Sequence, residues 1–140
     1  MPVATHQFSL DMQGDTHIEN ITDKVRRCLT ETGFHGGIIT IFVKHTTASV
    51  LVFEDEPGLR ADTRTIWNRL IAADPKWQHN TRNPGEDNGH SHLRGQLQGQ
   101  SLTVPFADQS LLLGTWQQLV IVDFDTRPRT RDIVVQIIGE

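Results

Sequence analysis

The 140-residue chain is poor in cysteine and has no long apolar segment. A single cysteine, Cys28, excludes an intrachain disulfide and a zinc site built of several thiolates, and agrees with a reducing compartment. No stretch reaches the roughly 20 apolar residues that cross a bilayer, and residues 1–13 lack the segments of a signal peptide. We therefore expect a cytoplasmic protein without a membrane partner.

Basic residues are also scarce. The chain has 13 Lys and Arg against 17 Asp and Glu, a formal net charge of −4. The cations are scattered and form no basic stripe that could neutralise nucleic-acid phosphates, so we expect no nucleic-acid partner. The apolar fraction of 36% is that of an ordinary globular protein. At this length we expect one domain spanning residues 1–140.

Runs of alternating or β-branched apolar residues predict a strand-rich chain. The expected strands are Val3–Met12, His17–Glu19, Ile38–Lys44, Ala48–Phe53, Ser101–Phe106, Leu111–Leu113, Gln118–Phe124 and Asp132–Ile138. The segments 118–124 and 132–138 are so apolar that we expect both of their faces to be covered, which favours oligomerisation.

Two longer segments have helical patterns. Thr22 is the expected N-cap of a helix that ends at Gly33, and Pro57 opens a second helix that continues to about Ala73. A short helical piece is expected over His92–Leu97. The order of elements lacks regular βαβ alternation, so we predict an α+β fold, a mostly antiparallel β-sandwich with two helices.

The polar connection 74–89 and the residues after it contain three of the seven histidines. In an extended segment His90 and His92 would point to the same side and could converge on one cation. His45, at the end of a strand, is the best third ligand for an open zinc site, and Asp87 or Glu54 could orient an imidazole. The alternative is that histidines in a polar loop are solvated surface.

Other polar segments also leave two interpretations open. Asp87-Asn88-Gly89 fits either turn chemistry or a functional site. Thr46, Thr47 and Ser49 could bind an anion, whereas no Gly-x-Ser-x-Gly elbow supports a serine nucleophile.

Two segments near the C-terminus are similarly ambiguous. The break at 114–117 is typical of a β-bulge with Trp116 in the core. Arg127, Arg129 and Arg131 could clamp a phosphate or could be solvated.

Four ordered motifs resemble those of the YjbQ-like family, whose members often carry the label secondary thiamine-phosphate synthase. The motifs are His45-Thr46-Thr47-Ala48-Ser49, Asp87-Asn88 leading to His92-Leu93-Arg94, Gly114-Thr115-Trp116-Gln117, and Arg127-Pro128-Arg129-Thr130-Arg131. The resemblance runs from about Phe8 to the C-terminus. Two departures are Phe53-Glu54 in place of an Asn-Glu pair and a turn at 125–129 that is one residue longer.

The resemblance implies a β-sandwich with two helices, assembled as a homotrimer, with a polar pocket near the subunit interface and histidine-bound metal in some members. The pocket residues that it implies in this chain are His45, Glu54, His79, Asp87, Asn88 and His92, with His90 less firmly placed.

We therefore predict a metal-binding enzyme that acts on a small phosphorylated compound. His45, His79 and His92 would hold a divalent ion, Zn²⁺ in the first place, while Asp87 or Glu54 would transfer protons. Mg²⁺ is the natural partner of a diphosphate, although a histidine-rich site suits it poorly. The predicted substrate contacts are Thr46, Thr47, Ser49, Asn88, His90, Trp116 and Arg129.

Three alternatives to this enzyme remain open. The chain could be a non-catalytic trimer that binds a metal or a small molecule, a metal-dependent phosphate-ester hydrolase, or a structural trimer whose histidines join the subunits.

Overall fold

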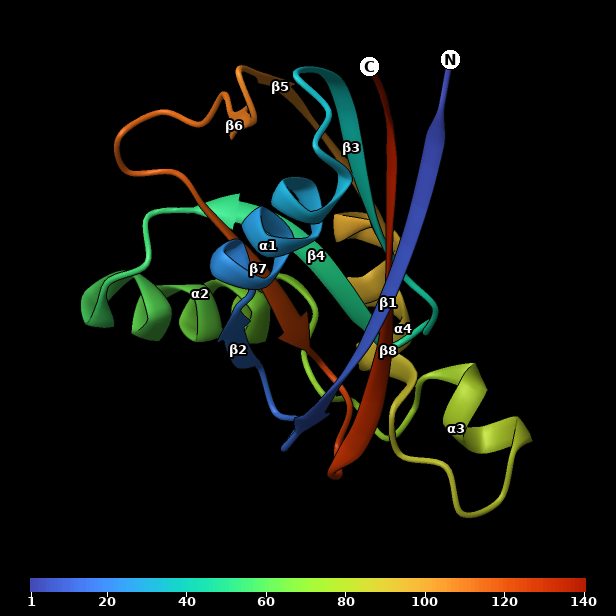
Figure 1. The fold of residues 1–140 in the computed structure, drawn as a ribbon. Helices are drawn as coiled ribbons and strands as arrows, with labels where there is room; N and C mark the ends of the chain where they lie inside the picture. Colours follow the sequence, from blue (N-terminus) through green and yellow to red (C-terminus); the bar gives the residue numbers. More distant parts are fainter.

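The computed structural model describes all 140 residues and shows an α+β fold in which every strand pair is antiparallel (Figure 1). Five strands form one sheet in the order β1-β8-β3-β5-β6, and three form a second sheet in the order β2-β7-β4. The strands are β1 (Val3–Met12), β2 (His17–Asn20), β3 (Gly36–Val43), β4 (Ala48–Phe53), β5 (Ser101–Ala107), β6 (Ser110–Leu111), β7 (Gln118–Asp123) and β8 (Arg129–Gly139).

The chain has four helices, two more than the resemblance implies: α1 (Thr22–Thr32), α2 (Pro57–Leu70), α3 (Gln78–Arg82) and α4 (Gly89–Gln98). Pro57 opens α2 as predicted, although that helix ends at Leu70 and not near Ala73. The short helical piece expected over 92–97 is part of the longer α4. None of the helices is long and apolar enough to span a membrane.

The N-cap prediction for α1 is wrong by one residue, whereas its end at Gly33 is confirmed by a left-handed C-cap. Ile21 occupies the N-cap position, and the side chain of Asn20 accepts a hydrogen bond from the Thr22 amide at 3.0 Å. The Thr22 hydroxyl instead accepts the amide N–H of Leu119 at 2.9 Å. Thr22 therefore links α1 to β7.

The main core is formed by the inner faces of both sheets and by α1. Leu119 and Ile121 of β7 belong to this core, while Val120 and Val122 pack on the other face of the strand with Trp67 of α2. Both faces of β7 are thus covered from within the chain. The prediction that both faces of residues 118–124 are covered is confirmed, and α2, not a second subunit, supplies the cover of the second face.

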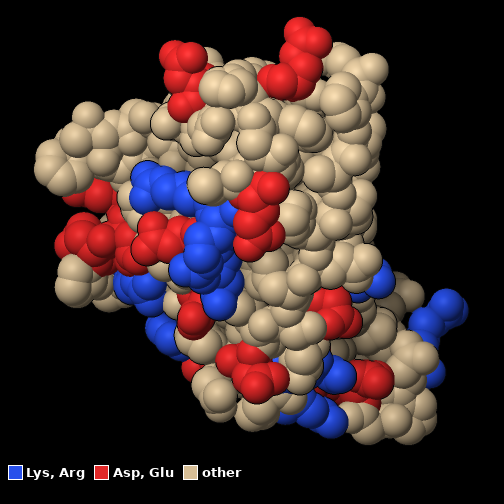
Figure 2. All heavy atoms as spheres, viewed as in Figure 1, with Lys and Arg blue, Asp and Glu red and all other residues tan.

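The outer face of the five-stranded sheet has no helix over it (Figure 1). Val3, Ile38 and Phe42 lie on this face with 55%, 44% and 46% of their surface exposed. The register places Ile38 opposite both Ile138 and Pro105, so apolar side chains extend across neighbouring strands. In Figure 2 the upper right flank, where β1 runs, carries no charged side chain, whereas charges gather over α1 and α2.

Four chain segments meet at one end of the two sheets. β7 ends where β4 begins, since Asp123 pairs with Ala48, and β8 begins only six residues after β7 ends. Helix α4 packs against β4 at this end because Gly95 has no side chain; a Cβ there would lie 2.5 Å from the Thr46 carbonyl oxygen. The fold therefore brings residues 44–47, 124–131 and the start of α4 to one place.

Candidate functional site

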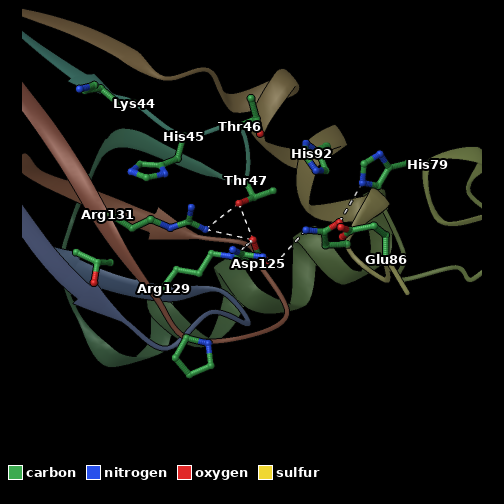
Figure 3. Close-up of a pocket in the computed structure, with 13 residues that line it drawn as sticks. Lys44, His45, Thr46, Thr47, His79, Glu86, His92, Asp125, Arg129 and Arg131 are labelled. Atoms are coloured by element: carbon green, nitrogen blue, oxygen red, sulfur yellow. Dashed lines mark hydrogen bonds and ion pairs between the residues drawn. The ribbon is translucent and has the colours of Figure 1, made fainter. Parts of the chain in front are cut away.

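A polar pocket of about 790 Å³ occupies this meeting point (Figure 3). None of its 13 lining residues is hydrophobic. They are Lys44, His45, Thr46, Thr47, His79, Glu86, Asn88, His92, Asp125, Pro128, Arg129, Thr130 and Arg131. The lining carries three cations, two carboxylates, three imidazoles and three hydroxyls. Because the cations outnumber the carboxylates, this surface suits an anionic, hydrogen-bonding ligand better than an apolar one.

A buried ion pair forms the floor of the pocket. Arg131 is 1% exposed, and its Nε and Nη2 donate to the two carboxylate oxygens of Asp123 at 2.8 and 2.7 Å. Nη2 also donates to the Thr47 hydroxyl at 2.8 Å. The remaining nitrogen, Nη1, has no hydrogen-bond partner within the chain. The guanidinium is thus held rigidly, with the two N–H groups of Nη1 left for a ligand.

Asp125 connects the two sides of the pocket. Its carboxylate accepts hydrogen bonds from Thr47 at 2.8 Å and from the Asn88 amide at 3.3 Å, and lies 2.6 Å from Nε of Arg129. Burial raises the pKa of this carboxyl group, but the hydrogen bonds from Thr126, Thr47 and Asn88 together with Arg129 outweigh burial, so the pKa lies below its ordinary value. Asp125 is therefore ionised at neutral pH.

His79 and His92 lie side by side on the opposite wall, with ring centroids 4.4 Å apart (Figure 3). Because the Asn88 amide N–H₂ points at Asp125, its oxygen faces Nε2 of His79 at 3.2 Å. This arrangement assigns the proton of His79 to Nε2 and leaves Nδ1 free. Burial, followed by the neighbouring His79, lowers the pKa of His92, so His92 is uncharged at neutral pH.

His45 lies beyond Arg131 and has a different protonation pattern. Its Nε2 accepts the backbone N–H of Asp132 at 2.9 Å. Burial and then Arg131 lower its pKa, so the ring is neutral at pH 7. A neutral ring that accepts at Nε2 carries its proton on Nδ1. His45 is therefore arranged to donate a hydrogen bond.

The structure brings seven of the residues predicted from the sequence to this pocket: His45, Thr46, Thr47, His79, Asn88, His92 and Arg129. It does not bring the three predicted metal ligands together as one set. No group of three or more His, Cys, Asp or Glu side chains in the chain is arranged to hold a metal ion. The site contains two neighbouring imidazoles, those of His79 and His92, and not three histidines around one ion.

The two predicted proton-transfer carboxylates lie outside the pocket lining. Asp87 is exposed, accepts a hydrogen bond from Thr126 at 2.7 Å and lies 3.4 Å from Arg127. The Thr126 hydrogen bond is the main reason that its pKa is lowered. Asp87 thus orients the 125–129 loop. Glu54 follows the far end of β4, about 20 Å from Thr47 along the strand.

Three predicted substrate contacts also lie elsewhere. His90 and His92 are on a helix and not in an extended segment, so two positions separate them by roughly 200° around its axis. His90 is buried away from the lining. Ser49 is buried and donates weakly to the Gly95 carbonyl at 3.4 Å. Trp116 is 70% exposed in the loop before β7, so the expectation of a core tryptophan is wrong.

The roles of Asp123 and Asp125 in the pocket were not predicted from the sequence, and neither was the burial of Arg131. The signal was present: an aspartate ends the apolar run of β7, and an arginine precedes the apolar run of β8. Charged residues at the ends of otherwise buried strands are typical of paired, functional positions. Lys44, Glu86 and Thr130 carried no such signal.

The fold and the pocket together define a small α+β protein with a polar, histidine-lined site at the ends of two antiparallel sheets. The family model described as "UPF0047 protein YjbQ-like" matches residues 6–140, so the chain belongs to the YjbQ-like UPF0047 family.

Related proteins and solved structures support the same family. The UPF0047 protein of Methanothermobacter thermautotrophicus is 32% identical over 140 residues, covering 100% of this chain and 95% of its own length. That of Archaeoglobus fulgidus is 32% identical, covering 93% and 98%. The crystal structure of a YbjQ-like protein of unknown function from Sulfolobus solfataricus has a TM-score of 0.93 and 31% identity, covering 99% of both chains.

The buried ion pair generates a stability prediction. We expect Arg131→Met to lower the free energy of unfolding by about 3–5 kcal/mol, because it leaves Asp123 charged, buried and unpaired. The double variant Asp123→Asn/Arg131→Met removes that charge and should cost less than the single change. The control Arg26→Met breaks the exposed Arg26–Asp23 pair and should cost less than about 1 kcal/mol. Urea unfolding measures the free energy of all three variants. If Arg131→Met lowers it no more than the control does, the Arg131–Asp123 pair does not stabilise the fold.

Proposed function

We propose that this protein is an enzyme that acts on a small phosphorylated compound and binds the phosphate in the polar pocket. The observation that carries the proposal is the immobilised Arg131, with Nη1 free, in a pocket that has no hydrophobic lining residue. A pre-oriented guanidinium binds phosphate without losing much side-chain entropy.

Other donors support the same ligand. Arg129 is held by Asp125 through Nε, and 42% of its side chain is exposed, so its terminal nitrogens remain accessible. The Nδ1–H of His45 adds a neutral donor, and Lys44 adds a third cation. In this proposal His45 donates a hydrogen bond to the anion and does not bind a metal ion.

His92 is the candidate for proton transfer, in place of Asp87 and Glu54. Its lowered pKa keeps the imidazole uncharged at neutral pH, as a general base requires. Glu86 lines the same pocket and is the only carboxylate there besides the hydrogen-bonded Asp125. Thiamine-phosphate synthesis, implied by the resemblance, and phosphate-ester hydrolysis both suit this arrangement. A pure binding protein would show neither activity.

Removing one cation tests the anion site. We expect Arg129→Gln to weaken binding of inorganic phosphate by about 10- to 100-fold, since a charge-assisted hydrogen bond is lost. The matched control is Arg127→Gln, two residues earlier, whose guanidinium faces the exposed Asp87 and does not line the pocket. Isothermal titration calorimetry measures both. Equal affinities for the two variants would show that phosphate does not bind in this pocket.

A divalent ion is a second candidate ligand, favoured by the 4.4 Å approach of His79 and His92. Two imidazoles supply only part of a zinc coordination sphere, so such an ion would also need water or a phosphate oxygen. We expect His92→Ala to reduce Zn²⁺ binding at least tenfold in calorimetry of metal-free protein, since one of two ligands is lost. Thr81→Ala, exposed on α3 and outside the pocket, is the control. Identical Zn²⁺ affinities in wild type and His92→Ala would remove the ion from the proposal.

The sandwich-and-homotrimer architecture that the resemblance implies is also part of the proposal. Its support is the uncovered outer face of the five-stranded sheet, where apolar and neutral side chains predominate. Thr40 and Thr103 pair with each other there at 2.9 Å, and Thr5 pairs with Gln136 at 2.8 Å. A neutral, flat face of this kind is typical of a surface that binds another copy.

A charge placed on this face tests the assembly. We expect the wild-type protein to have about three times the 15.8 kDa mass of one chain, and Phe42→Glu to reduce the mass toward one chain, because the carboxylate would be buried unpaired. Ile66→Glu is the matched control, since Ile66 is 47% exposed on α2, away from the sheet face. Light scattering after size-exclusion chromatography measures the mass. A monomeric wild type, or a Phe42→Glu protein of unchanged mass, would contradict this interface.

A further inference from the structure

A second cavity, of about 400 Å³, adjoins the polar pocket and shares only His79 and His92 with it. Its other lining residues come from the start of α3 and from one face of α4, and include Trp77, Leu93 and Gln96. No side chain of fixed charge lines it. The imidazole pair therefore stands between a charged compartment and an uncharged one.

Trp77 forms a fixed aromatic wall of the second cavity. Its indole Nε1 donates to the Ala72 carbonyl at 2.9 Å, and its backbone amide donates to Asp74 at 3.2 Å. The residue is 37% exposed. Because its only polar atom is already bonded within the chain, the exposed part of the ring offers a π surface to a ligand.

Helix α4 supplies the opposite wall. Gly89, Leu93 and Gln96 are spaced by four and three residues and lie on one helix face. A Cβ at Gly89 would lie 2.9 Å from the Trp77 Cβ, so the absence of a side chain there lets Trp77 pack close to α4. Leu93 adds apolar surface, and the amide of Gln96 can both donate and accept a hydrogen bond.

We infer that the ligand of this protein has two parts: a phosphate that occupies the polar pocket, and an uncharged aromatic group that occupies the cavity beside Trp77. This inference rests on the proposed function and specifies its substrate class. The polar pocket has no hydrophobic lining residue to contact a ring, and the second cavity has no lysine or arginine to bind a phosphate. A ligand that fills both passes alongside His79 and His92, where the proton-transfer candidate lies.

Phosphonates test the inference, since their C–P bond resists hydrolysis. Methylphosphonate reports on the polar pocket alone, while phenyl-, benzyl- and 2-phenylethylphosphonate carry the ring at increasing distance. We expect the best of the three to bind the wild-type protein at least about tenfold more tightly than methylphosphonate, because the ring leaves water and contacts Trp77. Calorimetry at one pH and salt concentration measures the four affinities.

Variants then locate the ring. Trp77→Ala should reduce the advantage of the aryl compound to less than about threefold while the affinity for methylphosphonate stays at the wild-type value; Trp77→Phe should retain most of it. Leu93→Ala provides a second test, and its matched control is Leu97→Ala, one turn further along α4 and 66% exposed outside the cavity. Circular dichroism verifies that each variant is folded.

The outcomes separate this inference from the proposed function. If methylphosphonate binds and no arylphosphonate binds better, the second cavity is not a subsite, and the phosphate pocket stands. If Trp77→Ala weakens methylphosphonate as much as the aryl compound, Trp77 only shapes the polar pocket and the inference fails. If no phosphonate binds the wild-type protein, the proposed function itself fails.

Discussion

The buried pairing of Arg131 with Asp123 is the constraint on which the rest of the site depends. A charge in the interior must be paired and hydrogen-bonded, since an unpaired one is strongly destabilising. Here both carboxylate oxygens and two guanidinium nitrogens are used within the pair, and Thr47 binds the same Nη2. The pair joins the end of β7 to the start of β8, and Thr47 adds the segment before β4.

The wall of the pocket that His79 and His92 form depends on the orientation of one carboxylate and one amide, those of Asp125 and Asn88. Asp125 orients Asn88, and Asn88 determines which nitrogen of His79 carries the proton. The position of the proton on His45 is determined in another way, by the backbone N–H of Asp132, which donates to Nε2. His45 and His79, which look equivalent in the sequence, therefore carry their protons on different ring nitrogens, because Nε2 of each has a different partner.

Close backbone approach positions the helices around this network. Gly95 lets α4 contact the segment before β4, and Gly89 lets α3 contact α4. Residues far apart in the sequence thereby surround two cavities of opposite character. The exposed apolar residues on the uncovered face of the five-stranded sheet, Val3, Ile38 and Phe42, line neither cavity.

The strands were the most predictable part of the fold. Val3–Met12 was predicted to the residue from the two-residue period of its apolar side chains, which a sheet with one buried face produces. Ala48–Phe53 was predicted to the residue from its β-branched run, which is typical of a strand. Helix α3 was not predicted, since its five residues are polar and have no apolar periodicity. His90 and His92 were paired wrongly because a two-residue spacing means one side in a strand and nearly opposite sides in a helix.

The sequence by itself determined the α+β class, most strand positions, and seven polar residues of the pocket, because these follow from local periodicity and from residue types rare in a core. Only the tertiary structure decided that Arg131 is buried against Asp123, that Asp125 links both walls, that Glu54 and Trp116 lie elsewhere, and that His45 lies beside Arg131, apart from the His79–His92 pair (Figure 3). Those outcomes depend on strand register and helix packing, which bring together residues of the site that are far apart in the sequence, such as His45 and Asp132, 87 positions apart. No local pattern encodes them.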